Sequence, residues 1–329
     1  MKIKATASFP GAESKSAAIE LFTPCFCDRD ITEKELKKIV KELRKKSGRS
    51  LVFKVKDLKN KGIIIHSHYD NSKFYNDKVY IKDGVYLYYH GSNDGYYNIE
   101  TYKFFTKEKP DLYIDEAIFK SSRSEKIKTS EATYKNFAEH LNCTFSMYYI
   151  DSCIRKIHFI AQCFHETGGF IDTSEKGGKD SYRGGKDFKG RGLIHITHDD
   201  NYLKYYDSTN VIKYFHLYQG YKKHKPGEGV TDYIKRKNKE KVNHGFPDQF
   251  IESKLKPFAK KLANNLQYSC YSAGWFWDSN DINKFATMDD SKKVSMKINK
   301  YDTTTFSDRK DYTNYLKDIF DYENCKNKK

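Results

Sequence analysis

Two different hydrophobic patterns divide the chain. Between residues 51 and 105 the apolar positions form short β-rich runs, which we expect to be strands at 51–55, 62–66, 79–81 and 85–89. Asp83-Gly84 lies between the last two runs and predicts a tight hairpin turn. From residue 130 onward the apolar spacing changes to three and four, which predicts helices at 133–141, around 154–164, at 258–277 and from 307 or 308 onward.

One more helix is predicted ahead of the strands. Thr32 and Glu35 have the spacing of a capping box, in which each side chain bonds the backbone N–H of the other. The apolar positions that follow share one helix face: Leu36, Ile39, Val40 and Leu43. The chain therefore predicts an α+β protein, with a small β-rich module with one helix at 1–114 and a mainly α domain at 115–329. The polar stretch 106–130 is expected to be a linker or the lead into the second domain.

The composition bears on location and partners. No run of about 18 apolar residues occurs, so we expect no membrane insertion. Residues 1–9 lack a continuous apolar segment, so we expect synthesis in the cytoplasm without a signal peptide. Sixty Lys+Arg against 44 Asp+Glu give a net charge of +16. This charge suits a polyanionic partner such as nucleic acid, anionic lipid or bacterial cell wall, or a Lys-rich surface that only maintains solubility. Because no nucleic-acid motif accompanies it, we expect no nucleic-acid partner.

The cysteines and histidines give no clear metal site. The seven cysteines have irregular spacing, so we expect reduced thiols, with Cys25 and Cys27 as the one doubtful pair. His66, His68 and Asp70 alternate as ligands on one strand face would, but a solvated strand end explains them as well. We therefore expect no metal and no cofactor.

A single glutamate is the first candidate for chemistry. Glu166 follows the apolar helical stretch and precedes Gly168-Gly169, which are expected to end the helix. A carboxyl at a helix C-terminus among aromatic neighbours has its ionised form disfavoured, so we expect a raised pKa, as a general acid requires. An exposed glutamate before a glycine cap is the alternative interpretation.

Two segments together resemble glycoside hydrolase family 19, the chitinase-like members of the lysozyme superfamily. They are His165-Glu166-Thr167-Gly168-Gly169-Phe170 and Phe188-Lys189-Gly190-Arg191-Gly192-Leu193-Ile194-His195-Ile196-Thr197, followed by Asn201-Tyr202. Later segments are similar too: Ser272–Trp277, Ile298-Asn299 and Ser307–Tyr312. The resemblance covers about residues 115–329 and implies a lysozyme-like catalytic domain.

The resemblance also implies roles for individual residues. Glu166 would be the general acid and Glu175 the base that activates water, with Asp172, Asp180 and Asp187 as the alternatives for the base. The implied substrate-binding residues are Thr197, Asn201, His195, Tyr202 and Asn299, and the implied supporting residues are Arg191, Arg309 and His165. Two positions depart from the family. His195 stands where relatives usually have Gln, and Lys300-Tyr301 replace a glycine pair.

The implied reaction is hydrolysis of β-1,4 bonds between N-acetylated sugars with inversion, which needs two carboxyl groups about 6.5–9.5 Å apart. Peptidoglycan is favoured over chitin, because the absence of a signal peptide suits an endolysin or an injected antibacterial effector. Segments 25–32 and 155–162 also resemble hydrolases associated with type VI secretion, which would add an immunity protein or the secretion machinery as partners. The protein would act at the cell wall or periplasm of a target cell, or of the host cell at lysis. The N-terminal module would bind the wall or serve delivery, and its tyrosines would contact carbohydrate or form ordinary cross-strand pairs. A catalytically silent glycan-binding protein with the same fold is the competing interpretation.

Overall fold

The structure is a computed structural model that describes residues 2–4, 18–20, 29–49, 52–219 and 227–326. Its α-helices are α1 (Glu33–Lys46), α2 (Val55–Asn60), α3 (Tyr134–Met147), α4 (Cys153–Glu166), α5 (Asp199–Thr209), α6 (Phe215–Gln219), α7 (Val230–Lys239), α8 (Lys256–Asn264), α9 (Leu266–Ser279), α10 (Ile282–Thr287), α11 (Ser291–Asn299), α12 (Phe306–Ile319) and α13 (Tyr322–Lys326). Short 3-10 turns lie at Gly91–Asn93, Gly185–Phe188 and Thr303–Thr305, and a π-helical turn lies at Ile251–Leu255. Among the described residues no helix is long and apolar enough to cross a membrane.

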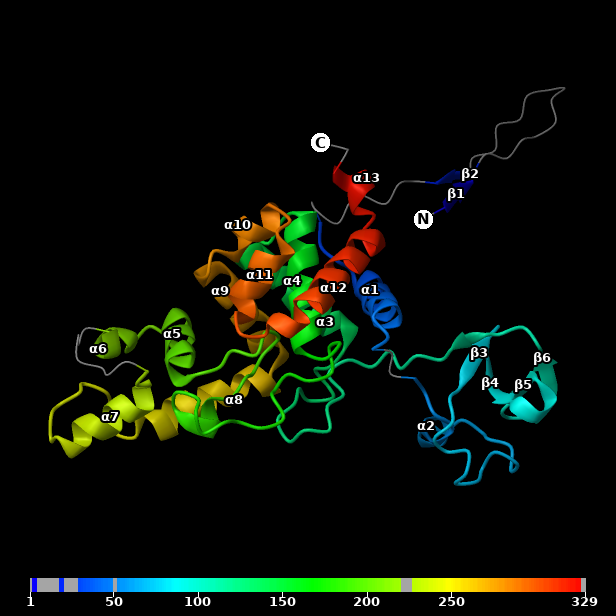
Figure 1. Ribbon diagram of the computed structural model, residues 1–329, viewed down its shortest axis with the longest axis horizontal. Helices are drawn as coiled ribbons and strands as arrows, with labels where there is room; N and C mark the ends of the chain where they lie inside the picture. Colours follow the sequence, from blue (N-terminus) through cyan, green and yellow to red (C-terminus); the bar gives the residue numbers. More distant parts are fainter. Residues whose placement is uncertain (1, 5–17, 21–28, 50–51, 220–226, 327–329) are drawn as a thin grey trace.

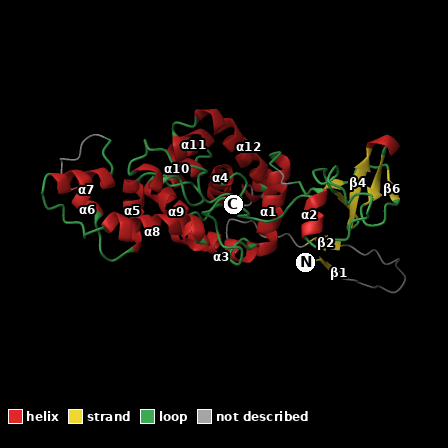
Figure 2. Ribbon diagram, turned by 90° about the horizontal axis from the view of Figure 1, so that it is seen from below, coloured by secondary structure: helices red, strands yellow, loops and turns green. Residues whose placement is uncertain are grey.

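The fold is α+β, with a large helical body and a small antiparallel sheet at one end of it (Figure 1). The two parts have separate hydrophobic cores. One core joins α1 to the helices after residue 130, and the other is confined to residues 53–99. Seen from below, the sheet still lies at the end of the molecule opposite α6 and α7 (Figure 2). The structure therefore has a mainly helical part and a small β-rich part, each with its own core.

The sheet has five strands in the order β6-β5-β4-β3-β7, and every neighbouring pair is antiparallel. The strands are β3 (Tyr80–Lys82), β4 (Val85–His90), β5 (Gly95–Asn98), β6 (Phe104–Thr106) and β7 (Asp111–Leu112). The predicted hairpin between β3 and β4 is present, and both turn residues, Asp83 and Gly84, have positive φ angles of 52° and 78°. This is the conformation that a two-residue turn of this kind requires. A second ribbon pairs β1 (Lys2–Lys4) with β2 (Ala18–Glu20).

Two of the predicted strands are wrong. Within 51–55 the chain forms only isolated bridges at Val52 and Lys54, and α2 begins at Val55 because the Asp57 carboxylate accepts from the Lys54 N–H at 2.8 Å. The run 62–66 is irregular, and Ile64 is 76% exposed. The Ile63 N–H instead bonds back to the Leu58 carbonyl and closes α2. Local capping thus overrides β propensity at both places.

The first helix belongs to the helical body, although it precedes the sheet in sequence. The predicted capping box is present: Glu35 N–H donates to Thr32 Oγ1 and Thr32 N–H donates to the Glu35 carboxylate. Leu36, Ile39, Val40 and Leu43 pack in the same core as α3 and α4. The segment 1–114 is therefore not one packing unit, because α1 packs with the helices.

The helix α4 runs through the centre of the helical body. The predicted stripe Ile154, Ile157, Ala161 and Phe164 is buried, but so are most of the positions between, because α4 is enclosed by α10, α11, α12 and α13. The predicted helix 258–277 is two helices, because Asn265 caps the start of α9 through the Tyr268 N–H.

One cysteine prediction is wrong, and one lies outside the described residues. Cys153 and Cys325 each take part in a disulfide bond rather than being reduced, but not with each other, because their Sγ atoms lie 3.3 Å apart, whereas Cys143, Cys163 and Cys270 are free thiols. Cys25 and Cys27 lie outside the described residues, as does the first half of segment 25–32.

Candidate active site

Glu166 is the last residue of α4, and its side chain reaches the surface of the helical body with 14% exposure. The helix ends here because Thr167 turns its hydroxyl back to the Cys163 carbonyl at 2.6 Å. Gly168 and Gly169 then take positive φ angles of 61° and 91°, which glycine adopts without strain. The chain turns away from the carboxyl group, and Glu166 remains at the end of a rigid, buried helix.

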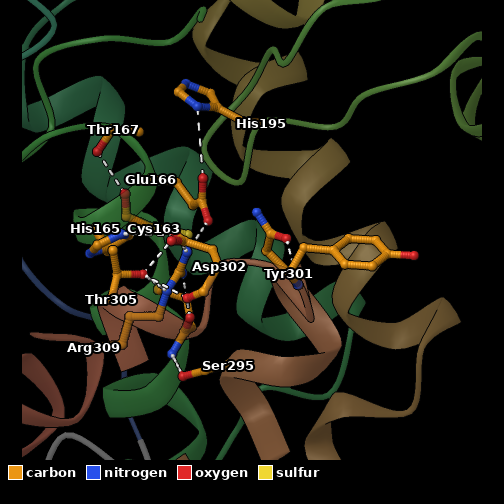
Figure 3. Close-up of polar contacts among 12 residues, drawn as sticks. Cys163, His165, Glu166, Thr167, His195, Ser295, Tyr301, Asp302, Thr305 and Arg309 are labelled. Atoms are coloured by element: carbon orange, nitrogen blue, oxygen red, sulfur yellow. Dashed lines mark hydrogen bonds and ion pairs between the residues drawn. The ribbon is translucent and has the colours of Figure 1, made fainter. Parts of the chain in front are cut away.

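A buried arginine holds the Glu166 carboxyl (Figure 3). Arg309 of α12 is fully buried, and its Nη2 lies 2.5 Å from Glu166 Oε1 and 3.4 Å from Asp302 Oδ2. Its Nη1 donates to Gln162 Oε1 at 2.7 Å, one helical turn before Glu166. Buried charges are stable only when they are paired in this manner. The charged and polar partners of Glu166 are thus Arg309 on α12 and His195 on the Gly-Arg-Gly turn.

His165 packs behind this group as a neutral ring. Its side chain is 10% exposed, and its Nε2 lies 3.8 Å from Asp302 Oδ2. Burial, with Arg309 and Arg49 nearby, lowers the pKa of His165 to about 3. The imidazole is therefore uncharged at neutral pH, and Arg309 is the cation of this cluster.

His195 lies on the opposite side of the Glu166 carboxyl from Arg309. Its Nδ1 is 3.8 Å from Glu166 Oε2, and its backbone has a φ of 51° at the exit of the Gly-Arg-Gly turn (Figure 3). Burial lowers the pKa of His195, while the negative charges of Glu166 and Glu175 act in the opposite direction. The ring therefore interacts electrostatically with both predicted catalytic carboxylates.

Glu175 is held on the same turn. Its Oε2 accepts the Gly190 N–H at 3.1 Å, its Oε1 accepts the Tyr182 hydroxyl at 2.7 Å, and its own N–H bonds the Gly190 carbonyl at 2.8 Å. The Tyr182 pKa rises to about 12, mainly through burial and then through this bond.

The alternative bases are placed differently. Asp180 pairs with Lys186 and Asp187 with Lys256, and both carboxylates are mostly exposed. Asp172 is bound by the Ser121 hydroxyl and by Arg123. Among the candidate bases, Glu175 is therefore the one whose carboxylate is held by the Gly190 turn.

The Gly-Arg-Gly turn is fastened from outside its own segment. Arg191, 2% exposed, makes two hydrogen bonds of 2.7 and 3.0 Å to the carboxylate of Glu125. A Cβ on Gly190 would lie 2.9 Å from His195 Cβ, and Gly192 has a φ of +83°. Both positions therefore require glycine, and the stretch 121–126 is part of this site rather than a plain linker.

The remaining predicted residues separate into two groups. Thr197 and Asn201 are half-buried and joined to the turn: Thr197 Oγ1 donates to the His195 carbonyl at 2.9 Å and Asn201 Nδ2 donates to the Thr197 carbonyl at 2.9 Å. Tyr202 is fully buried, and its hydroxyl donates to the Lys189 carbonyl at 2.5 Å. Its predicted substrate contact is wrong, because no part of it is exposed. Asn299 is exposed at the end of α11, and its Oδ1 accepts the Tyr301 N–H at 3.2 Å.

Four residues of this arrangement were not predicted: Gln162, Asp302, Glu125 and Arg123. Gln162 lies four residues before Glu166 on α4, a spacing that places both on one helix face, and this signal was present in the sequence. Asp302 joins the cluster through Arg309 and His165, with no local pattern to mark it. Glu125 and Arg123 lie in a polar stretch whose partners are about 50 to 66 residues away.

This arrangement is suited to proton transfer. Two carboxylates, Glu166 and Glu175, lie on separate rigid supports, and both act on His195. Such pairs can give a proton at one atom and take one at another. Among the described residues no group of three or more potential ligands is placed to hold a metal ion. Asp70, considered above as a possible metal ligand with His66 and His68, instead accepts hydrogen bonds from Lys59 and Tyr75.

Comparison with known proteins gives little. No protein-family model matches the chain, and no curated protein matches it in sequence. Among solved structures, a chitinase C mutant is similar with a TM-score of 0.35 and 14% identity, covering 74% of this chain and 94% of the other. A structural similarity at this level does not support an argument about function. The function must therefore be inferred from the residues of this chain.

Proposed function

We propose that this protein is a glycoside hydrolase that cleaves β-1,4 bonds between N-acetylated sugars by an inverting mechanism with two carboxyl groups. The observation that carries the proposal is the placement of Glu166 between Arg309 and His195, with Glu175 fixed on the same Gly-Arg-Gly turn as His195. The family 19 resemblance of the same segments supports it, because Glu166 and Glu175 are the residues at its acid and base positions.

In the proposed reaction Glu166 gives a proton to the glycosidic oxygen, and Glu175 takes one from the attacking water. Arg309 fixes the orientation of Glu166 and compensates its charge after the proton has left. Tyr182 and the Gly190 N–H hold the Glu175 carboxylate toward the water. Thr197 and Asn201, joined to the same turn, are proposed to orient the water and an N-acetyl group.

We propose peptidoglycan as the substrate, ahead of chitin. The net charge of +16 favours approach to an anionic cell wall by long-range attraction. Action at the wall or periplasm of a target cell, or at lysis of the host cell, follows from this substrate, as an endolysin or an effector with an immunity partner. The sheet module (residues 52–114) is the part proposed to bind the wall or to serve delivery.

A glycan-binding protein without turnover is the second candidate. His195 and Lys300-Tyr301 favour it, because they stand where the family resemblance expects other residues. Tyr301 is 83% exposed beside Asp302, so an aromatic surface replaces two glycines.

The test measures release of reducing sugar fragments from purified peptidoglycan and, in parallel, from chitin oligomers. The wild-type protein should release fragments, and Glu166→Gln should lower the rate by about 10²–10⁴-fold while binding to sedimented wall persists. Glu139→Gln, on the exposed face of α3, is the matched control and should leave the rate unchanged. Wall binding without any fragment release by the wild-type protein would favour the binding protein instead.

A further inference from the structure

His195 lies beside Glu166 and is linked to Glu175 through the Gly190 turn. On one side its Nδ1 lies 3.8 Å from Glu166 Oε2. On the other side its Cβ packs against Gly190, whose N–H binds Glu175 Oε2 at 3.1 Å. The His195 ring therefore lies beside Glu166, and the turn against which its Cβ packs also holds Glu175.

The ring also has a hydrogen bond with the Asp172 backbone, which raises the pKa of His195. His195 Nε2 is buried and has no hydrogen-bond partner among the described residues. In Figure 3 this edge of the ring faces away from Glu166.

We propose that His195 transfers a proton between Glu175 and Glu166, and that this is the reason for histidine where the family resemblance expects glutamine. The proposal rests on the proposed hydrolase function. Glutamine can orient a ligand, but only a titratable ring can accept a proton at one nitrogen and release another at the opposite one.

The inverting reaction creates a need for such a transfer. After one cleavage Glu166 has lost its proton to the leaving sugar, and Glu175 holds the proton that it took from water. His195 Nε2 takes the Glu175 proton, through water, while Nδ1–H gives its proton to Glu166 Oε2. Both carboxyl groups are then ready for the next substrate, and the ring recovers its starting tautomer by exchange with solvent when the product leaves.

The charges around the ring are compatible with this role. Burial and Arg123 lower the pKa of His195, whereas Glu166 and Glu175 raise it, and His165 nearby is neutral. The ring is thus uncharged at rest and able to accept a proton. Two of the influences that raise the pKa come from Glu166 and Glu175, the residues between which the ring is proposed to act.

The experiment compares wild type, His195→Gln and His195→Ala in sugar release across pH. We expect His195→Gln to lower kcat by about tenfold or more with KM changed by less than about twofold, a smaller loss than that of a direct general acid. The pH dependence of kcat should change shape, and added imidazole should restore part of the His195→Ala rate. His216→Gln, on the exposed side of α6, is the matched control and should change none of these.

Each outcome decides between the two proposals. An active wild-type protein whose His195→Gln variant keeps its kcat and pH profile would overturn the proton transfer and leave the hydrolase function intact. Wild-type inactivity on every glycan overturns both. A titration of the His195 ring by NMR supplies a readout that does not depend on turnover, because Glu175→Gln removes the resting carboxylate of the pair and should lower the pKa of the ring. If Glu175→Gln leaves that titration unchanged, the ring does not interact with Glu175 and the proposal is wrong.

Discussion

Arg309 Nη2 lies 2.5 Å from Glu166 Oε1, and this ion pair is one of the contacts that join α12 to the C-terminal end of α4. The two residues are separated by 143 positions in sequence. Because Arg309 is fully buried, the carboxylate is more than a catalytic candidate, since it also compensates a charge inside the core. The same pair therefore links the stability of the helical body to its proposed chemistry.

Removing this arginine should destabilise the protein strongly. Arg309→Met leaves Glu166, Asp302 and Gln162 without their shared donor, and breaking a buried ion pair costs about 3–5 kcal/mol. Adding Glu166→Gln to this variant should recover part of the loss, because one uncompensated charge disappears. Denaturant unfolding followed by circular dichroism measures both, with Lys120→Met as the control, since Lys120 forms an exposed pair with Asp115. Equal stability of Arg309→Met and Lys120→Met would show that the buried pair contributes nothing.

The elements that the sequence predicted well are those whose signals are local. The capping box at Thr32 and the Asp83-Gly84 turn are both present, because each needs only residues within a few positions. The stripe on α4 likewise identified a long helix, although the spacing did not reveal that the helix is enclosed on all sides. The strand predictions for 51–55 and 62–66 were wrong because Asp57 caps a short helix between these two runs.

The candidate site was predicted only in part, because half of it is assembled from distant segments. Glu166, His195 and Glu175 lie in or near the two motifs, and the structure places His195 3.8 Å from Glu166 and bonds Glu175 to Gly190. The two hydrogen bonds from Arg191 to the Glu125 carboxylate join positions 66 residues apart, and no periodic pattern in the sequence predicts this pairing. Tyr202 was misjudged for the same reason, since burial beneath Arg191 depends on packing that the motif does not encode.

Replacing the second carboxylate should separate the candidates for the base. Glu175→Gln should reduce sugar release by about 10²-fold or more, because the amide cannot take a proton from water. Asp180→Asn should keep activity near the wild-type level, since Asp180 pairs with Lys186 at the surface. Initial rates on peptidoglycan give the comparison. A small effect of Glu175→Gln together with a large effect of Asp172→Asn would move the base to Asp172.

The net charge of +16 should make binding to the cell wall sensitive to salt. Salt screens long-range attraction over about 8 Å at roughly 0.15 M. Binding to isolated sacculi, measured by sedimentation, should therefore weaken markedly as salt rises from well below to well above that concentration. Cleavage of a short neutral oligomer should change far less, because its groups act in direct contact. Equal salt dependence for both would mean that the basic surface serves solubility alone.

Acid should destabilise the fold through His165. Burial and two arginines lower its pKa to about 3 in the folded protein, against about 6.5 in the unfolded chain. Between these values the unfolded state binds more protons, so stability falls as pH decreases from 6.5 toward 3, by at most about 1.4 kcal/mol per pH unit from this group. His165→Gln should therefore lose less stability than wild type over this window, whereas His216→Gln should follow wild type because His216 is exposed. Unfolding midpoints in urea at pH 7, 6, 5 and 4 provide the measurement. Parallel pH curves for wild type and His165→Gln would show that this ring is protonated in the folded state, and the buried cluster behind Glu166 would then carry a second cation beside Arg309.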